Sequence, residues 1–167
     1  MKRSISIILI VLGLGAVVTI VGFYQINIDA LQEPGPIETI FATQAKHILV
    51  HRSSSRDSIS PAPTDLRASI EEGDKLYGTE CAMCHGPNGH TPTDFGRWMY
   101  PRASDLTSPE VQQYSDRELF WIVKNGIRLS GMPAFGKVES DEHVWNLAHY
   151  VRTLGGSARP DSGGTAH

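Results

Sequence analysis

The sequence predicts an all-α fold, with one apolar N-terminal helix that spans a membrane and a small helical domain with long loops. Three observations lead to this prediction. The run 5–23 is apolar or glycine except for two hydroxyl side chains, and three later segments have apolar residues at helical spacing. No segment alternates between apolar and polar residues well enough to predict a strand.

The composition limits both the core and the classes of partner. The chain has 167 residues, a formal charge of −3 and 40% apolar residues, many of which lie in the N-terminal run. A nearly balanced charge argues against a nucleic-acid-binding protein, which needs a basic face. Two cysteines are too few for a disulfide framework or for a four-ligand zinc site of cysteines.

The N-terminal run is predicted to anchor the chain. Its 19 residues approach the roughly 20 that a membrane-spanning helix needs. They exceed the about 7–15 residues of the apolar region in a signal peptide. The triplet 28–30 is a poor cleavage site, so we expect an uncleaved anchor within 1–28, with a signal peptide as the alternative. Lys2 and Arg3 predict a single pass with a cytoplasmic N-terminus and a periplasmic remainder.

Three further segments flank or precede the folded domain. Apolar residues at helical spacing predict an amphipathic helix in 29–52, which would lie on the lipid surface or dock on a partner subunit. Within it, His47 and His51 are four apart, a spacing that suits two metal ligands or two solvated side chains. Composition predicts a flexible linker at 53–64 and a disordered tail at 157–167, which leaves 65–156 as the folded domain.

The domain is predicted to contain three main helices. Asp65 can cap a helix that runs to about Glu80, and Ser140 can cap one that runs to Leu154. Ser115 and Glu118 form a capping-box pattern before a helix that ends near Lys124. The long loop between the first two helices has no periodicity, yet it contains Phe95, Trp98, Met99 and Tyr100. Such side chains need an apolar surface, which a large buried prosthetic group would supply.

The pentapeptide 81–85 indicates which prosthetic group this is. It reads Cys-Ala-Met-Cys-His, the C-x-x-C-H attachment signature of c-type haem. Two thiols three apart at a helix end can reach both vinyl groups on one porphyrin edge, and His85 then offers its imidazole to the iron. A redox dithiol would need strands around the motif, and a zinc site would need a second cysteine pair; the sequence indicates neither.

With this motif, residues 65–154 resemble the class I mono-haem cytochromes c. Gly73 and Tyr77 match the family's first helix where it crosses the last, and Leu147 and Tyr150 stand at the facing positions. Further matches lie at 85–89, 100–106, 125–127 and 131–133. The resemblance implies the cytochrome c fold, in which three main helices and long loops surround one covalently attached haem c.

The resemblance also implies the remaining cofactor contacts. Met132, in a loop 47 residues after His85, is expected to be the second axial ligand; Met99 and an open position are the alternatives. The Pro92 carbonyl is expected to accept from Nδ1 of His85, a role that a proline has in the family. Arg97 and Trp98 are expected to bond the propionates, with a solvated surface charge as the alternative for Arg97. The pocket is expected to include Tyr100, Leu106 and Ile127, with Leu119, Ile122 and Phe135 as further wall residues.

The predicted function is single-electron transfer by a membrane-tethered carrier. With both axial positions filled, no position is left for a small-molecule substrate, so the chain is not itself expected to be an enzyme. Its partners would be the membrane and redox proteins, most simply as a subunit of a respiratory or photosynthetic complex. Two alternatives remain: a subunit that receives electrons from a periplasmic dehydrogenase, and a five-coordinate haem that binds gas or reacts with peroxide.

Overall fold

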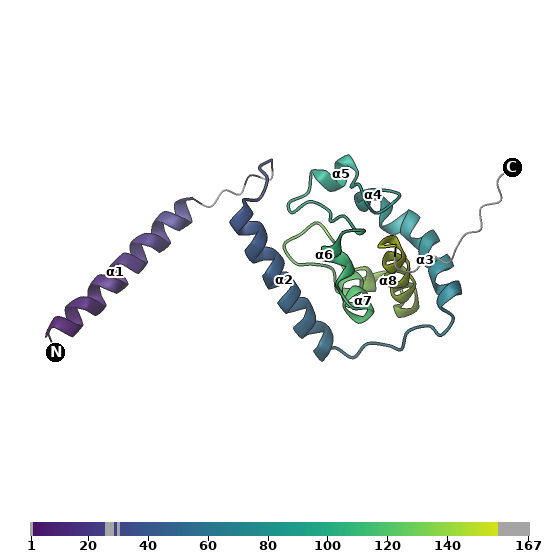
Figure 1. Ribbon diagram of the computed structural model, residues 1–167, viewed down its shortest axis with the longest axis horizontal. Helices are drawn as coiled ribbons and strands as arrows, with labels where there is room; N and C mark the ends of the chain where they lie inside the picture. Colours follow the sequence, from purple (N-terminus) through teal and green to yellow (C-terminus); the bar gives the residue numbers. More distant parts are fainter. Residues whose placement is uncertain (1, 26–28, 30, 157–167) are drawn as a thin grey trace. The chain divides into compact units, whose positions relative to one another are not determined.

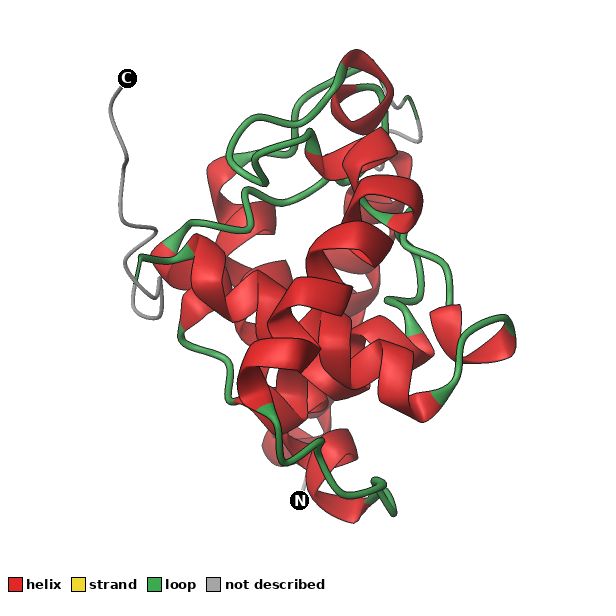
Figure 2. Cartoon of the chain, turned by 90° about the vertical axis from the view of Figure 1, so that its right-hand side faces the viewer, coloured by secondary structure: helices red, strands yellow, loops and turns green. Residues whose placement is uncertain are grey.

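The computed structural model describes residues 2–25, 29 and 31–156, and within them every regular element is a helix (Figure 2). The all-α prediction is therefore confirmed for the described chain. The chain divides after Gln32 into two compact units. The predicted disordered tail and most of the cleavage-like triplet lie outside the described residues.

The first unit contains α1 (Lys2–Tyr24). Its segment Ile5–Tyr24 has a mean hydropathy of 2.8 over 20 residues and is not buried against the rest of the chain. A helix satisfies its own backbone polar groups, so this segment is long and apolar enough to cross a membrane.

The second unit contains the remaining helices, which surround one core (Figure 1). In chain order they are α2 (Pro36–Arg56), α3 (Leu66–Glu80), α4 (Ala82–His85), α5 (Asp94–Arg97), α6 (Pro109–Gln112), α7 (Asp116–Asn125), the 3-10 helix η1 (Phe135–Lys137) and α8 (Asp141–Leu154). The three helices predicted for the domain are α3, α7 and α8. Asp65, Ser115 and Ser140 cap them as predicted, each accepting from the amide of the third residue that follows.

The crossing of α3 and α8 organises the domain (Figure 1). At Gly73 a Cβ atom would lie 2.1 Å from the backbone oxygen of Asn146, so only glycine lets the two helices approach this closely. One turn later the rings of Tyr77 and Tyr150 pack with their centroids 5.1 Å apart. This crossing was predicted from the sequence.

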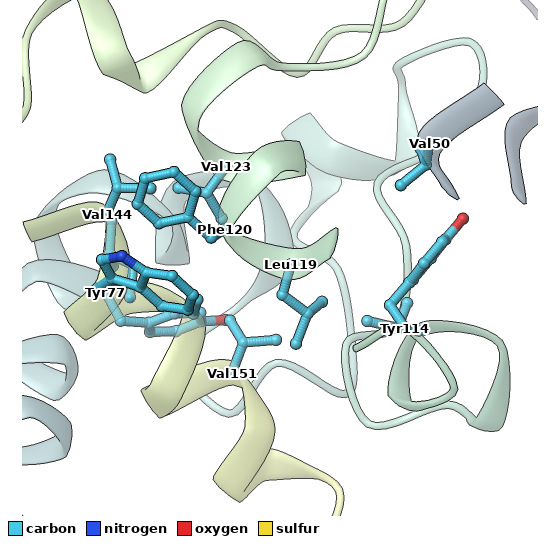
Figure 3. Packing of buried hydrophobic residues seen from close by; sticks show 12 residues of the cluster. Val50, Tyr77, Tyr114, Leu119, Phe120, Val123, Val144 and Val151 are labelled. Carbon is cyan, nitrogen blue, oxygen red and sulfur yellow. The ribbon is translucent and has the colours of Figure 1, made fainter. Parts of the chain in front are cut away.

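The core lies where α7 and α8 face each other. Phe120 and Val144 are fully buried within this cluster (Figure 3). Leu147 is also fully buried, and Phe120 packs on Trp145 with ring centroids 4.5 Å apart. The core also includes Val50 of α2, which lies on the same side of the cluster as Tyr114 (Figure 3). A residue from before the predicted domain thus contributes to its core.

The prediction of a flexible linker at 53–64 is wrong in its first part, because α2 continues to Arg56. The hydroxyls of Ser54 and Ser55 both donate to the carbonyl of His51, so these serines are accommodated within the helix. Beyond the helix, Ile59 packs against the core and Trp145 donates from Nε1 to the carbonyl of Ser60 at 2.9 Å. Residues 53–60 are therefore part of the folded unit.

One face of α2 is docked on the haem-motif domain of its own chain. Lys46 pairs with Glu110 at 2.8 Å, and Arg117 donates to the carbonyl of Ser54 at 2.9 Å. Ser54 is only 1% exposed. The helical spacing predicted a lipid surface or a partner subunit for this helix and gave no sign of docking within the chain.

The two histidines of α2 take part in the same contact. His51 donates from Nδ1 to Glu118 at 3.0 Å, and His47 stacks on Tyr114 with ring centroids 4.3 Å apart. Across the described residues, no cluster of three or more His, Cys, Asp or Glu side chains could hold a metal ion. His47 therefore packs on the domain, whereas His51 pairs with Glu118 while its side chain stays 77% exposed, in agreement with the solvated alternative.

Candidate functional site

The pentapeptide 81–85 lies at the turn between α3 and α4. Cys81 is both the last cap of α3 and the first of α4, and Cys84 and His85 lie in α4. The buried hydroxyl of Tyr77 donates to the carbonyl of Gly86 at 2.7 Å and holds the end of α4 against α3. Gly86 has a φ of 77° and faces the carbonyl of Thr91, which is the reason for a glycine directly after the motif.

The hydrogen bond of His85 fixes which ring nitrogen is free. Its Nδ1 lies 2.8 Å from the carbonyl oxygen of Ser104. A carbonyl only accepts, so Nδ1 carries the proton and Nε2 keeps its lone pair. Burial lowers the pKa of His85, against a smaller opposing effect of this hydrogen bond, which favours the neutral ring that binds metals.

This contact corrects one predicted role. The acceptor for Nδ1 is Ser104, and the expectation that the Pro92 carbonyl has this role is wrong. The loop that carries Pro92 is held differently: Thr93 donates from its amide to the carbonyl of Cys84 at 3.1 Å and from its hydroxyl to that of Met83 at 2.6 Å. These two bonds hold the loop against α4. The hydrogen bond to Nδ1 of His85 comes instead from the loop before Leu106.

The two thiols have raised pKa values. Burial, with smaller effects of Glu80 and Cys84, raises the pKa of Cys81 to about 12, and burial also raises that of Cys84. Redox dithiols and thiolate metal ligands instead have lowered pKa values in electropositive surroundings. These surroundings favour the neutral thiols and not the reactive thiolate of a redox dithiol.

Met132 lies in a tightly closed loop between α7 and η1. Ser130 donates from Oγ to the carbonyl of Ile127 at 2.7 Å and accepts from the amide of Met132 at 3.2 Å. Gly126, with a φ of 66°, faces the carbonyl of Met132. The loop places Met132 half-buried against the core.

Met99, the alternative ligand, has another position. Its sulfur lies 2.5 Å from where a Cβ of Gly131 would be, so Met99 packs on the loop beside Met132. The expected packing of Met99 against the haem stays a prediction.

The other predicted contacts divide into two groups. Leu106 and Ile127 are half-buried against the same core as Cys81 and Met132, together with the expected wall residues Ile122 and Phe135. Outside that group, Arg97 pairs with Asp94, Tyr100 donates to Glu38, and Trp98 is 74% exposed. The roles of Arg97, Trp98 and Tyr100 at the cofactor stay predictions.

A cavity of about 600 Å³ lies between α2 and the loops at 100–101 and 126–130. Tyr100 and Ile127 line it, but the cysteines, His85 and Met132 do not. A cofactor site must contain its own ligands, so we place the site at α4 and the Met132 loop and not in this cavity.

The residues present fit a c-type haem. Two thiols three positions apart, an imidazole with a free Nε2 and a thioether from a separate loop are the donors that such haem requires. No strand surrounds the motif in the described chain, so the thioredoxin-like alternative is not supported.

Comparison with known proteins agrees with this fit. Residues 68–151 match the family model described as cytochrome c oxidase, cbb3-type, subunit III. The chain belongs to this family. Its relatives include the cbb3-type cytochrome c oxidase subunit CcoP of Azospirillum brasilense, 32% identical over 110 residues, which are 59% of this chain and 32% of CcoP.

A second relative is a different kind of protein. The quinohemoprotein alcohol dehydrogenase ADH IIB of Pseudomonas putida is 26% identical over 149 residues, which are 85% of this chain and 20% of the dehydrogenase. This chain thus matches about a third and a fifth, respectively, of the lengths of these two curated relatives.

Two solved structures are also similar. The KustC0563 c-type cytochrome has a TM-score of 0.44 and 31% identity, with 49% of this chain and 95% of that chain covered. A chain of the Kuenenia stuttgartiensis reducing HAO-like protein complex Kustc0457/Kustc0458 has a TM-score of 0.43 and 23% identity, with 60% of this chain and 52% of that chain covered.

Membership of the cbb3-type family confirms the main predictions. The chain is a c-type cytochrome of an electron-transfer family, its cofactor is haem c, and its N-terminal helix is long and apolar enough to anchor it in a membrane. Sequence reasoning missed Ser104 and Thr93, because both act on the motif through backbone groups or a cap. The available signal was the match of residues 100–106 to the family, which marked this loop as part of the site.

Proposed function

We propose that this chain carries one electron at a time through a single haem, attached at Cys81 and Cys84 and ligated by His85 and Met132. The observation that carries the proposal is the 2.8 Å contact between Nδ1 of His85 and the Ser104 carbonyl. It leaves Nε2 free and sets the ring orientation before any iron binds. When bound, haem supplies an iron that changes oxidation state by one electron.

Each residue of the chain has a separate part. Cys81 and Cys84 hold one porphyrin edge, so the cofactor stays attached through repeated redox cycles. The Ser104 carbonyl makes His85 a more basic ligand by accepting the hydrogen bond from its Nδ1–H. Met132 offers a soft thioether, which favours reduced iron and raises the reduction potential. Further contacts would come from Arg97, Trp98, Tyr100, Leu106 and Ile127.

Haem counting and denaturing gels test the attachment. The purified wild type should contain one haem per chain by its pyridine haemochrome spectrum, and the haem stain should stay with the chain on a denaturing gel. Cys81→Ala with Cys84→Ala should remove the stained band, while Met83→Ala, in the same motif but 63% exposed, should keep it. Stain retained in the double variant would overturn covalent attachment.

We further propose that the chain works as a subunit of a respiratory complex, with its haem domain on the outer face of the cytoplasmic membrane. The family and the similarity to CcoP support this, as do Lys2 and Arg3 before the anchor. Purification from the native membrane in mild detergent should give haem-stained material well above the monomer mass on native gels. A single band at the monomer mass would contradict subunit membership.

A second candidate function is delivery of electrons from a dehydrogenase. It is favoured by the match to the quinohemoprotein alcohol dehydrogenase, which covers 85% of this chain. The haem chemistry is the same in both cases, so the two functions are distinguished by the partner protein. Mass spectrometry of chains that co-purify should find oxidase subunits for the first candidate and a quinone-cofactor dehydrogenase for the second. Carbon monoxide binding by the reduced protein would instead indicate an open axial position.

A further inference from the structure

The helix α2 has two unlike faces, and the apolar one faces outward. Lys46, Val50 and Ser54, spaced four apart, form the face that docks on the domain, where Val50 is 2% and Ser54 1% exposed. The opposite face has four large apolar side chains that are 62–72% exposed: Ile37, Ile40, Phe41 and Ile48. An amphipathic helix on a soluble domain normally has the reverse orientation.

These four residues, which we call the apolar stripe, follow one side of the helix. Positions 37, 41 and 48 are spaced by four and seven residues, and position 40 lies beside them, so their side chains share one face. Gln44 is the one polar side chain within the stripe. The stripe therefore extends over three turns of α2 without a charge.

The contacts of the docked face prevent the stripe from turning inward. Lys46 is paired with Glu110 at 2.8 Å, and Arg117 donates to the carbonyls of Ser54 and Asp57 at 2.9 and 2.6 Å. A rotation that buried the stripe would break these contacts and expose Val50. The stripe must then be covered by something outside this domain.

We propose that the apolar stripe lies in the headgroup region of the membrane that α1 spans. The proposal goes beyond electron transfer and rests only on membrane anchoring. The helix α1 ends at Tyr24 and α2 begins at Pro36, and eleven residues of chain reach at most about 40 Å. The start of α2 is therefore kept within about 40 Å of the end of the anchor.

The charge of α2 agrees with an anionic lipid surface. The helix has three Lys and Arg residues but one Glu. Arg52 and Arg56, near its C-terminal end, are exposed and form no ion pair with any described residue. Arg52 follows Ile48 by one turn, so a cation continues the stripe. Apolar residues beside cations are typical of helices that lie in the interface plane.

Such a contact would fix how the carrier is presented. A domain held only by a flexible linker rotates freely above the membrane, whereas a domain with α2 in the headgroup layer keeps one orientation. The haem would then move by lateral diffusion at a constant height. Electron transfer to a membrane partner would not need a rotational search.

Spin labels in nanodiscs test the proposal. The full-length holoprotein, one copy per disc of phosphatidylcholine and phosphatidylglycerol, has a label at Ile48→Cys or, as a control, at Glu71→Cys on α3. Both side chains are 64% exposed in the structure. With the haem reduced, collisions with a water-soluble nickel chelate and with oxygen are measured. The label at 48 should show several-fold fewer nickel collisions and more oxygen collisions than the label at 71.

Equal nickel accessibility at positions 48 and 71 would overturn the proposal. Exposure at 48 in single-copy discs but shielding in native membranes would also overturn it, since a partner protein then covers the stripe. Shielding of position 48 only in discs that hold two copies would also overturn the proposal, because a second copy of the chain would then cover the stripe. Failure of α1 to anchor would be recognised separately, because the protein would then be missing from the disc fraction while its haem spectrum stayed normal.

Discussion

At the scale of single residues, Met132 carries the axial role that one substitution can test. Met132→Ala should abolish the weak near-infrared charge-transfer band of thioether-ligated ferric haem and lower the reduction potential, because a soft ligand no longer favours reduced iron. Absorption spectroscopy and potentiometric titration measure both. Met83→Ala is the matched control, since Met83 is 63% exposed and should leave the band intact. A band that survives in Met132→Ala would assign the ligand to another residue.

Another residue-scale feature is a buried polar cluster at the crossing of α3 and α8. The Ser69 hydroxyl donates to Oδ1 of Asn146 at 2.5 Å and lies 2.8 Å from Nδ1 of His149. His149 is 7% exposed and packs on Trp145 with ring centroids 5.5 Å apart. Burial lowers the pKa of His149, with a smaller opposing effect of Asp116, so the folded protein favours the neutral ring.

This cluster predicts a loss of stability in acid. The folded-state pKa of His149 lies below the ordinary 6.5, so its contribution is fully present above pH 6.5 and is lost as the pH falls from there toward the folded-state value. Guanidinium unfolding of the holoprotein at a series of pH values measures this. In His149→Gln the decline below pH 6.5 should be shallower. An unchanged slope would show that other groups cause the acid sensitivity.

The residue scale also shows what the sequence could predict. Cys81, Cys84 and His85 were recognised because their chemistry resides in side chains at a fixed spacing. Ser104 was not, because its carbonyl is a backbone group that any residue at that position offers. Pro92 was assigned the role by resemblance, and the loop after Gly89 instead uses Thr93 to cap α4. Backbone groups that hydrogen-bond an iron ligand are placed by the path of their loop, and local sequence does not specify that path.

At the scale of elements, the crossing of α3 and α8 depends on Gly73. A Cβ there would meet the backbone oxygen of Asn146 at 2.1 Å, so Gly73→Ala should cost about 1–3 kcal/mol or more as the helices separate. Gly78→Ala is the matched control on the same helix, where nothing lies within 4 Å, and it should stabilise by about 0.5–1 kcal/mol. Denaturant titrations of the holoprotein measure both. Similar stabilities for the two variants would contradict the close approach.

The elements differ in how far they were predictable. The helices α3, α7 and α8 begin at Asp65, Ser115 and Ser140 as predicted, because capping side chains and apolar spacing are local signals. The end of α2 was placed four residues early, because the serines at 53–55 were interpreted as linker composition. Its docking depends on contacts more than sixty residues apart in sequence, such as Lys46 with Glu110, which no local pattern indicates.

At the scale of the whole molecule, α2 changes the arrangement that composition predicts. Composition predicts four parts: an anchor, a free helix, a loose linker and a haem domain. In the structure the last three form one folded unit that begins at α2. The sparse apolar residues of the domain are supplemented by Val50, and the helix that supplies it keeps its own apolar stripe outside. The electron carrier is therefore tethered through a helix that belongs to its fold.

This arrangement predicts how α2 responds to substitution. Amides of α2 should be protected from hydrogen exchange in the detergent-solubilised holoprotein, and Val50→Asn should speed their exchange about tenfold or more, since a buried amide side chain without partners opens the interface. Ile48→Asn makes a similar β-branched-to-amide change at a 64% exposed position two residues away and should leave exchange unaltered. Exchange read by mass spectrometry separates α2 from α3 and α8, which should keep their protection in both variants. If α2 exchanges in the wild type as fast as in Val50→Asn, the helix is not part of the folded unit, and the haem domain swings on a longer tether than the structure indicates.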